Sequence, residues 1–182
     1  YRDGLGVAKD QAEAVKWYRK AADQNFAEAQ SNLGVCYGHG DGVAKDEVEE
    51  VTWYRKAAEQ NHALAQHNLS VSYAQGRGVA KDEAEAVKWC RKAAGQNYVE
   101  AQYNLGFCYE RGIGVAKDLV ESYQWMLLAA AQGHEGAKMV ANTVERQLTR
   151  EQLADGQQRA GEFKPPEATA LQSPQGEGHG KS

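Results

Sequence analysis

The feature that most constrains this chain is an internal repeat of 36 residues. The pentapeptide Gly-Val-Ala-Lys-Asp occurs four times at that interval, as residues 6–10, 42–46, 78–82 and 114–118. A tryptophan follows the same period, at Trp17, Trp53, Trp89 and Trp125. A fixed period of this length is the signature of stacked supersecondary units, so it predicts a solenoid whose units do not fold singly.

Each unit is predicted to contain two helices. The longer one begins after an Asp that is followed three residues later by Glu, as in Asp46 and Glu49, and it ends at an Asn or Gly, as in Asn61. A shorter helix is predicted at about 26–38 and at the equivalent positions, with Ala29 and Leu33 on its buried stripe. The alternation predicts an all-α solenoid of antiparallel helix pairs.

Composition agrees with this fold and excludes several classes of protein. Alanine, the strongest helix former, accounts for 29 of the 182 residues. The formal net charge of -4 argues against a nucleic-acid-binding face, and no run of eighteen apolar residues predicts membrane insertion. Three cysteines, an odd number, do not make a disulfide framework.

The pattern changes toward the C-terminus. Residues 1–148 are predicted to form the solenoid, with a leading half unit, full units at 26–61, 62–97 and 98–133, and one further helix. Thr149 and Gln152 make a capping-box pattern, so residues 149–163 are predicted to form a terminal capping helix. Residues 164–182 contain all three prolines and little apolar content, which predicts a disordered tail.

Over residues 1 to about 163, the pattern A-x-x-x-L-G-x-x-Y-x-x-G-x-G-V-x-K-D-x-x-x-A-x-x-W-Y-x-K-A-A resembles the SEL-one-like repeat (SLR) family, relatives of the tetratricopeptide repeat. The resemblance implies a right-handed superhelix with the shorter helices on its concave side, and a role as an adaptor or scaffold for protein complexes. Some bacterial relatives carry a disulfide within each unit, but Ala22 and Gln30 stand at the corresponding places here.

Three residues depart from the repeat and are expected to loosen the packing locally. Glu50 stands where the other units have small residues, Ser70 replaces a glycine, and Cys90 replaces a tyrosine. The tryptophans and the cysteines are expected to be core residues rather than ligands.

The sequence offers no pattern for catalysis, a metal or a cofactor. The Gly-x-Gly turns lack the third glycine of a dinucleotide fingerprint and follow a helix instead of a strand. No serine is followed three residues later by Lys, and His62 and His67, five residues apart, point to different helix faces. We therefore expect a protein that is not an enzyme.

One face of the shorter helices differs between units while the core repeats. This face is the predicted partner-binding surface, and its candidate residues are Asn32, Leu64, His67, Asn68, Glu100, Tyr103, Asn104 and Phe107. Tyr103 and Phe107, one turn apart, form the predicted aromatic anchor. The three asparagines repeat, and they fit hydrogen bonding to an extended peptide and hydrogen bonding within the scaffold equally well.

The leading functional hypothesis is a scaffold that binds a peptide or partner protein on the concave face. An enzyme of the β-lactamase or penicillin-binding type, suggested by the disulfide-bearing relatives, is the disfavoured alternative. The third hypothesis is end-to-end self-association through the open apolar face of the helix at 10–25. The sequence leaves the cellular compartment open.

Overall fold

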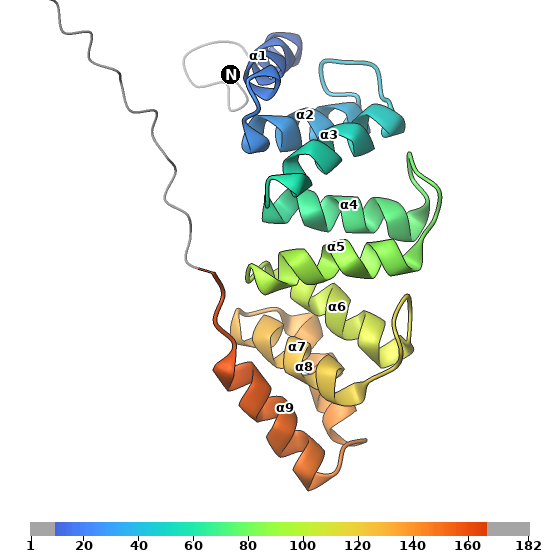
Figure 1. The fold of residues 1–182 in the computed structure, drawn as a ribbon, viewed down its shortest axis with the longest axis vertical. Helices are drawn as coiled ribbons and strands as arrows, with labels where there is room; N and C mark the ends of the chain where they lie inside the picture. The colour runs from blue at the N-terminus through green and yellow to red at the C-terminus, as the bar shows by residue number, and fades with distance from the viewer. Residues whose placement is uncertain (1–9, 167–182) are drawn as a thin grey trace, which may run out of the picture.

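The computed structural model describes residues 10–166, and within that range the chain is all-helical. The helices are α1 (Gln11–Asp23), α2 (Ala27–His39), α3 (Glu47–Glu59), α4 (Ala63–Gln75), α5 (Glu83–Gly95), α6 (Val99–Arg111), α7 (Leu119–Ala131), α8 (Glu135–Glu145) and α9 (Arg150–Glu162). They stack along the long axis of the molecule as successive antiparallel pairs (Figure 1). This is the predicted α-solenoid; the predictions for residues 1–9 and 167–182 lie outside the described residues.

Local side chains set the helix ends as predicted. The Asp46 carboxylate accepts hydrogen bonds from the backbone N–H groups of Val48 and Glu49, at 2.9 and 3.0 Å, and so caps α3. Asn25, Asn61 and Asn97 all have φ of 66°, in the left-handed region. The predicted difference in helix length is wrong: α1 to α7 each have 13 residues, because the chain already turns at the residue before each of these asparagines.

The Gly-x-Gly loops bring the chain close to the preceding unit. Gly76 closes α4 with φ of 70°, and Gly78, with φ of 65°, lies directly against the backbone carbonyl of Glu47 at the start of α3. A Cβ atom at residue 78 would collide with that backbone, so the close approach requires glycine.

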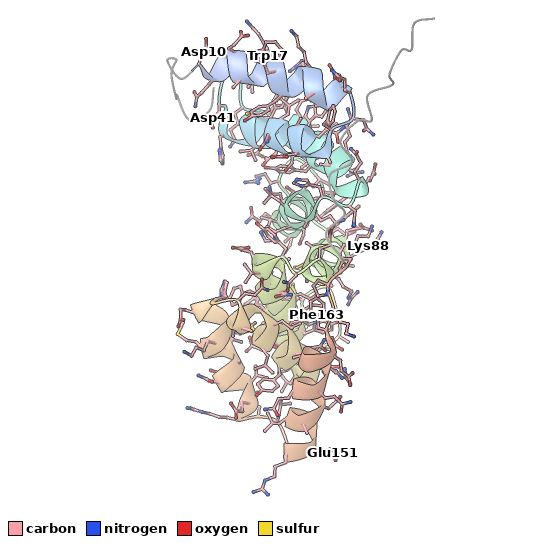
Figure 2. All side chains as sticks on the ribbon, turned by 90° about the vertical axis from the view of Figure 1, so that its left-hand side faces the viewer. Asp10, Trp17, Asp41, Lys88, Glu151 and Phe163 are labelled. Atoms are coloured by element: carbon pink, nitrogen blue, oxygen red, sulfur yellow. The ribbon has the colours of Figure 1, made fainter. Side chains whose placement is uncertain are left out.

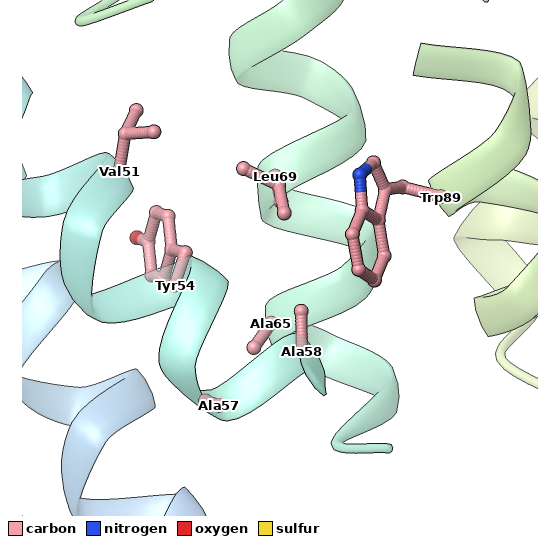
Figure 3. Packing of buried hydrophobic residues seen from close by; sticks show 7 residues of the cluster. All are labelled: Val51, Tyr54, Ala57, Ala58, Ala65, Leu69 and Trp89. Atoms are coloured by element: carbon pink, nitrogen blue, oxygen red, sulfur yellow. The ribbon is translucent and has the colours of Figure 1, made fainter. Parts of the chain in front are cut away.

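The core lies between consecutive helix pairs, where the tryptophans join one unit to the next. Trp89 reaches from α5 toward Leu69 and Ala58 of the preceding pair (Figure 3). Trp53, Trp89 and Trp125 are buried, as predicted. The prediction is wrong for Trp17, which is 49 % exposed on the outer side of α1 (Figure 2), because no described helix pair precedes α1 to receive its ring.

A buried ladder of amides also connects the units. The Gln30 side chain donates to the Ala22 carbonyl at 3.2 Å, and its own carbonyl accepts from the Gln60 amide at 2.7 Å. The Gln66/Gln96 and Gln102/Gln132 pairs repeat the second bond at the same distance. Ala22 and Gln30 are thus hydrogen-bonded to each other, and within residues 10–166 no disulfide forms.

The three departures from the repeat are accommodated by matching changes. Glu50 is buried and accepts a 2.9 Å hydrogen bond from Arg77, an arginine that the other units lack. The Cys90 thiol donates to the Ala101 carbonyl at 3.2 Å and interacts with Ser70, and it is a small group where the other units place a larger side chain. All three side chains are buried. Burial does not test local loosening, which stays a prediction.

The C-terminal helix α9 begins with the predicted capping box between Thr149 and Gln152. It lies beside α7 (Figure 1), where Arg159 pairs with Glu121 at 2.9 Å and the Phe163 ring meets the Trp125 ring edge-on at 5.7 Å. Residues 164–166 follow without regular structure and are exposed.

Candidate functional site

An open groove of about 290 Å³ runs between α6 and α8, the second helices of their pairs. Its lining residues are Tyr103, Phe107, Glu110, Arg111, Gly136, Met139, Val140 and Thr143. Both helices reach it with residues three and four apart, which share one helix face. We refer to this feature as the α6–α8 groove.

The groove displays large apolar side chains to solvent. Phe107 is 36 % exposed and Met139 is 66 % exposed, and they come from opposite walls. Exposed apolar side chains gathered in one groove, unlike single scattered ones, are typical of an interaction site. Methionine adapts its shape to varied partners, which suits such a surface.

Tyr103 is held in place from α8. Its ring stacks on the ring of His134, with centroids 4.4 Å apart and planes inclined by 21°. His134 Nδ1 in turn accepts a 3.0 Å hydrogen bond from the Ala137 N–H at the first turn of α8. The wall of the groove at Tyr103 is therefore fixed before any ligand arrives.

A charged pair borders the apolar floor. The Arg111 guanidinium lies 5.4 Å from the centre of the Phe107 ring, and its Nε is 3.6 Å from a carboxylate oxygen of Glu110. Such a groove can bury an apolar side chain and offer hydrogen bonds at its edge.

The remaining candidates on α4 and the start of α6 do not line this groove. Leu64 is 37 % exposed, and the His67 ring lies 5.2 Å from the Tyr98 ring. Burial lowers the pKa of His67, while the Glu100 carboxylate acts in the opposite direction. These side chains form a second cluster, between α4 and α6.

The three asparagines are partly buried. The Asn68 side chain interacts with the Tyr54 hydroxyl of the helix packed behind it. That contact favours the scaffold interpretation for Asn68. For Asn32 and Asn104 both interpretations remain predictions.

The predicted binding surface omitted one whole wall of the groove. Gly136, Met139, Val140 and Thr143 stand 36 residues after Glu100, Tyr103, Asn104 and Phe107, at the same places in the repeat. Carrying the register one helix further would have found them. Gly136 has no side chain where the other units carry Glu or Leu, which leaves room beside Tyr103.

Within residues 10–166, no group of three or more His, Cys, Asp or Glu side chains is arranged to hold a metal ion. No helix in the same range has the length and apolar character needed to cross a membrane.

The Sel1 repeat matches this chain at four consecutive segments, residues 1–26, 27–62, 63–98 and 99–134. The chain belongs to the Sel1 repeat family. No curated protein matches it in sequence.

Solved structures of Sel1 repeat proteins share the fold. A Sel1 repeat protein from Oxalobacter formigenes is 36 % identical, with a TM-score of 0.76 over 90 % of this chain and 70 % of its own. The protein c5321, a protective antigen of uropathogenic Escherichia coli with an SLR fold, is 31 % identical, with a TM-score of 0.63 over 89 % of this chain. This chain spans only 43 % of that antigen.

The cysteine-rich protein B of Helicobacter pylori is also similar, at 25 % identity and a TM-score of 0.59 over 75 % of this chain and 99 % of its own. Sel1 repeat proteins generally serve as protein-interaction scaffolds, and the fold is typically not catalytic.

Proposed function

We propose that this Sel1 array is a scaffold that binds a partner protein by taking an apolar side chain of an exposed peptide segment into the α6–α8 groove. The observation that carries the proposal is the pairing of Phe107 and Met139, exposed on opposite walls of one groove. A few large side chains that become buried when a partner binds typically carry most of the binding energy of an interface.

The groove differs from the equivalent surfaces of the other units, which supports a recognition role. Phe107 stands where the earlier second helices have Val35 and Val71, and Met139 where they have Ser31 and His67. A residue needed only for stacking would repeat, as Leu33, Leu69 and Leu105 do.

The test is affinity capture from a lysate of the source cells with three baits: the wild-type chain, Phe107→Ala/Met139→Ala, and the matched control Phe26→Ala. Phe26 is an exposed aromatic residue at the start of α2, distant from the groove in the sequence and absent from its lining. Phe26 and Met139 are more than half exposed, whereas Phe107 is 36 % exposed, so circular dichroism melts first establish that each variant is folded at the capture temperature.

Retained proteins are identified by mass spectrometry. The proposal predicts a protein that the wild type and Phe26→Ala baits retain and the groove variant does not. A peptide from the binding segment of that protein should compete with the protein for the wild-type chain. If the groove variant retains every protein that wild type retains, the α6–α8 groove is not the binding site.

A further inference from the structure

A second groove lies on the outward face of α3. It has a volume of about 440 Å³. Its lining consists of Val48, Val51, Thr52, Arg55, Lys56 and Glu59 of α3, with Gly78 and Val79 of the loop between α4 and α5. We call it the α3 groove. It lies on the first helix of a pair, whereas the α6–α8 groove lies between second helices, so the two grooves are separate surfaces.

The floor of the α3 groove departs from the repeat. Val48 is 64 % exposed where α1 and α5 have Ala12 and Ala84. Thr52 stands where those helices have Lys16 and Lys88, both of which pair with a glutamate on their own helix. The neighbouring helices thus present small and charged groups here, while α3 presents an exposed valine and a threonine whose hydroxyl donates to the Val48 carbonyl at 2.8 Å.

The last unit shows what this face of a first helix can accept. In α7 the equivalents of Val48 and Val51 are Val120 and Tyr123, and α9 lies against both. A Cβ atom on Gly156 of α9 would be 2.9 Å from the Tyr123 ring and 3.6 Å from the Val120 carbonyl oxygen. A helix therefore seats on this face when it presents a small residue at the point of closest approach.

The border of the α3 groove differs from that of α7 in charge. Arg55 donates a 2.8 Å hydrogen bond to the Tyr73 hydroxyl, and the Lys56 ammonium lies 3.9 Å from the centre of the Trp53 ring. Both side chains stay exposed while these contacts hold them in position. The equivalent residues of α7 are Leu127 and Leu128, so the α9 seat lacks these two cations. The helices α1 and α5 hold the same Arg and Lys pair in the same contacts, so what sets α3 apart from them is Val48 and Thr52 beside the pair.

We propose that the α3 groove is a second docking site, and that its occupant is an acidic amphipathic helix of a partner protein. The helix places a small residue over Val48 and Val51 and directs carboxylates at Arg55 and Lys56. Hydrogen bonds between these cations and carboxylates are charge-assisted, and the positioned cations reduce the ordering cost of binding. Glu59, the one acidic residue in the groove lining, lies on the next turn and disfavours a carboxylate beyond Lys56.

The test uses a phage library of helical 18-residue peptides in an alanine-rich frame with one randomised face. The library is selected on the wild-type chain and counter-selected with Val48→Lys. The affinity of each enriched peptide is then measured by fluorescence anisotropy. The matched control is Ala84→Lys, which introduces the same charge at the same place on α5. Circular dichroism melts confirm that both variants fold, as expected for exposed positions.

We expect enriched peptides that carry Asp or Glu beside a small residue. Val48→Lys should weaken their binding at least tenfold, and Ala84→Lys should leave it unchanged. Arg55→Gln/Lys56→Gln should weaken binding and flatten its salt dependence. The proposal fails if no enriched peptide depends on Val48, or if the dependent peptides lack acidic residues. It also fails if light scattering shows that a second copy of the chain occupies the site.

The result is independent of the α6–α8 groove. Peptides bound at the α3 groove keep their affinity for Phe107→Ala/Met139→Ala. A peptide that loses affinity for that variant binds the other groove and counts against this assignment.

Discussion

Gly38 and Glu50 share one small space: a Cβ atom on Gly38 would lie 2.5 Å from the Glu50 carboxylate oxygen Oε1. The other units fill the same two places differently, with Ala74 and Ala86 in one and Glu110 and Ser122 in the next. No unit combines a larger side chain at the first place with glutamate at the second. The pair is therefore one matched change across two helices.

This matching predicts that the effect of Gly38→Ala on the free energy of unfolding changes sign with the residue at position 50. With Glu50 present, the added methyl displaces a buried carboxylate that Arg77 holds, and we expect a loss of about 1–3 kcal/mol. In a Glu50→Ala background the same change should stabilise α2 by about 0.5–1 kcal/mol, because alanine is the better helix former. Urea unfolding of the four proteins measures the coupling. Equal effects in the two backgrounds would contradict it.

Glu50 also predicts a pH dependence. Burial raises the pKa of Glu50, and the Arg77 charge offsets part of that rise. A raised folded-state pKa means that the contribution of Glu50 to stability is fully present below about 4.3, the value in an unfolded chain, and is lost as pH rises through the folded-state pKa.

Glu50→Gln removes this titration. The difference in free energy of unfolding between Glu50→Gln and wild type should therefore shift in favour of Gln between pH 4 and pH 7. Thermal melts across that range test the prediction, with Glu59→Gln as the exposed control on the same helix. Parallel stability profiles for wild type and Glu50→Gln would refute it.

Ser70 and Cys90 form a second matched pair, and we expect Cys90→Tyr to destabilise the chain. In the preceding unit Tyr54 occupies the equivalent place, and its ring lies where a Cβ atom on Gly34 would be only 2.7 Å away. Ser70 already has a Cβ atom, so a tyrosine at position 90 should overpack the site and cost about 1–3 kcal/mol.

Ser70→Gly/Cys90→Tyr restores the combination found in the preceding unit and should recover most of that loss. The control is Ser70→Gly alone, which should cost about 0.5 kcal/mol through helix propensity. Unfolding midpoints of the three variants and wild type provide the comparison. A stable Cys90→Tyr single variant would show that the two positions are independent.

The sequence was sufficient for features that one short segment determines. Asp46 caps the helix that follows it, and Asn61 adopts the left-handed turn that ends the same helix, so both boundaries follow from neighbouring residues. The capping box at Thr149 was predictable for the same reason. The Trp17 prediction was wrong because it followed from the repeat position alone, whereas burial of that ring depends on a neighbouring unit and its helix belongs to the leading half unit.

Features that join residues far apart in the sequence could be found only in the structure. Glu50 and Arg77 are 27 residues apart, and the repeat pattern shows each only as an irregularity. Met139 could have been predicted, since it stands 36 residues after Tyr103. The repeat pattern changes after Gly133, however, and this hid that α8 forms the wall opposite α6. Only the α6 wall of the groove was predicted, because its residues lie in a complete unit and differ from the equivalent residues of the other complete units.

The last prediction concerns His62, which caps α4. Its Nδ1 accepts a 3.3 Å hydrogen bond from the Ala65 N–H, a bond that only the neutral imidazole can make through that nitrogen. Burial lowers the pKa of His62, while Glu28 opposes the shift. The contribution of His62 to stability is therefore present above about 6.5, the value in an unfolded chain, and is lost as pH falls through the folded-state pKa.

Asparagine at position 62 would keep a capping oxygen without titrating. We therefore expect His62→Asn to match wild type within about 0.5 kcal/mol at pH 7.5 and to be more stable by about 0.5–1 kcal/mol at pH 5.5. Thermal melts of both proteins from pH 5 to pH 8 measure this, and the other histidines cancel because both chains contain them. A difference in melting temperature that stays constant across the range would show that the His62 cap does not respond to protonation.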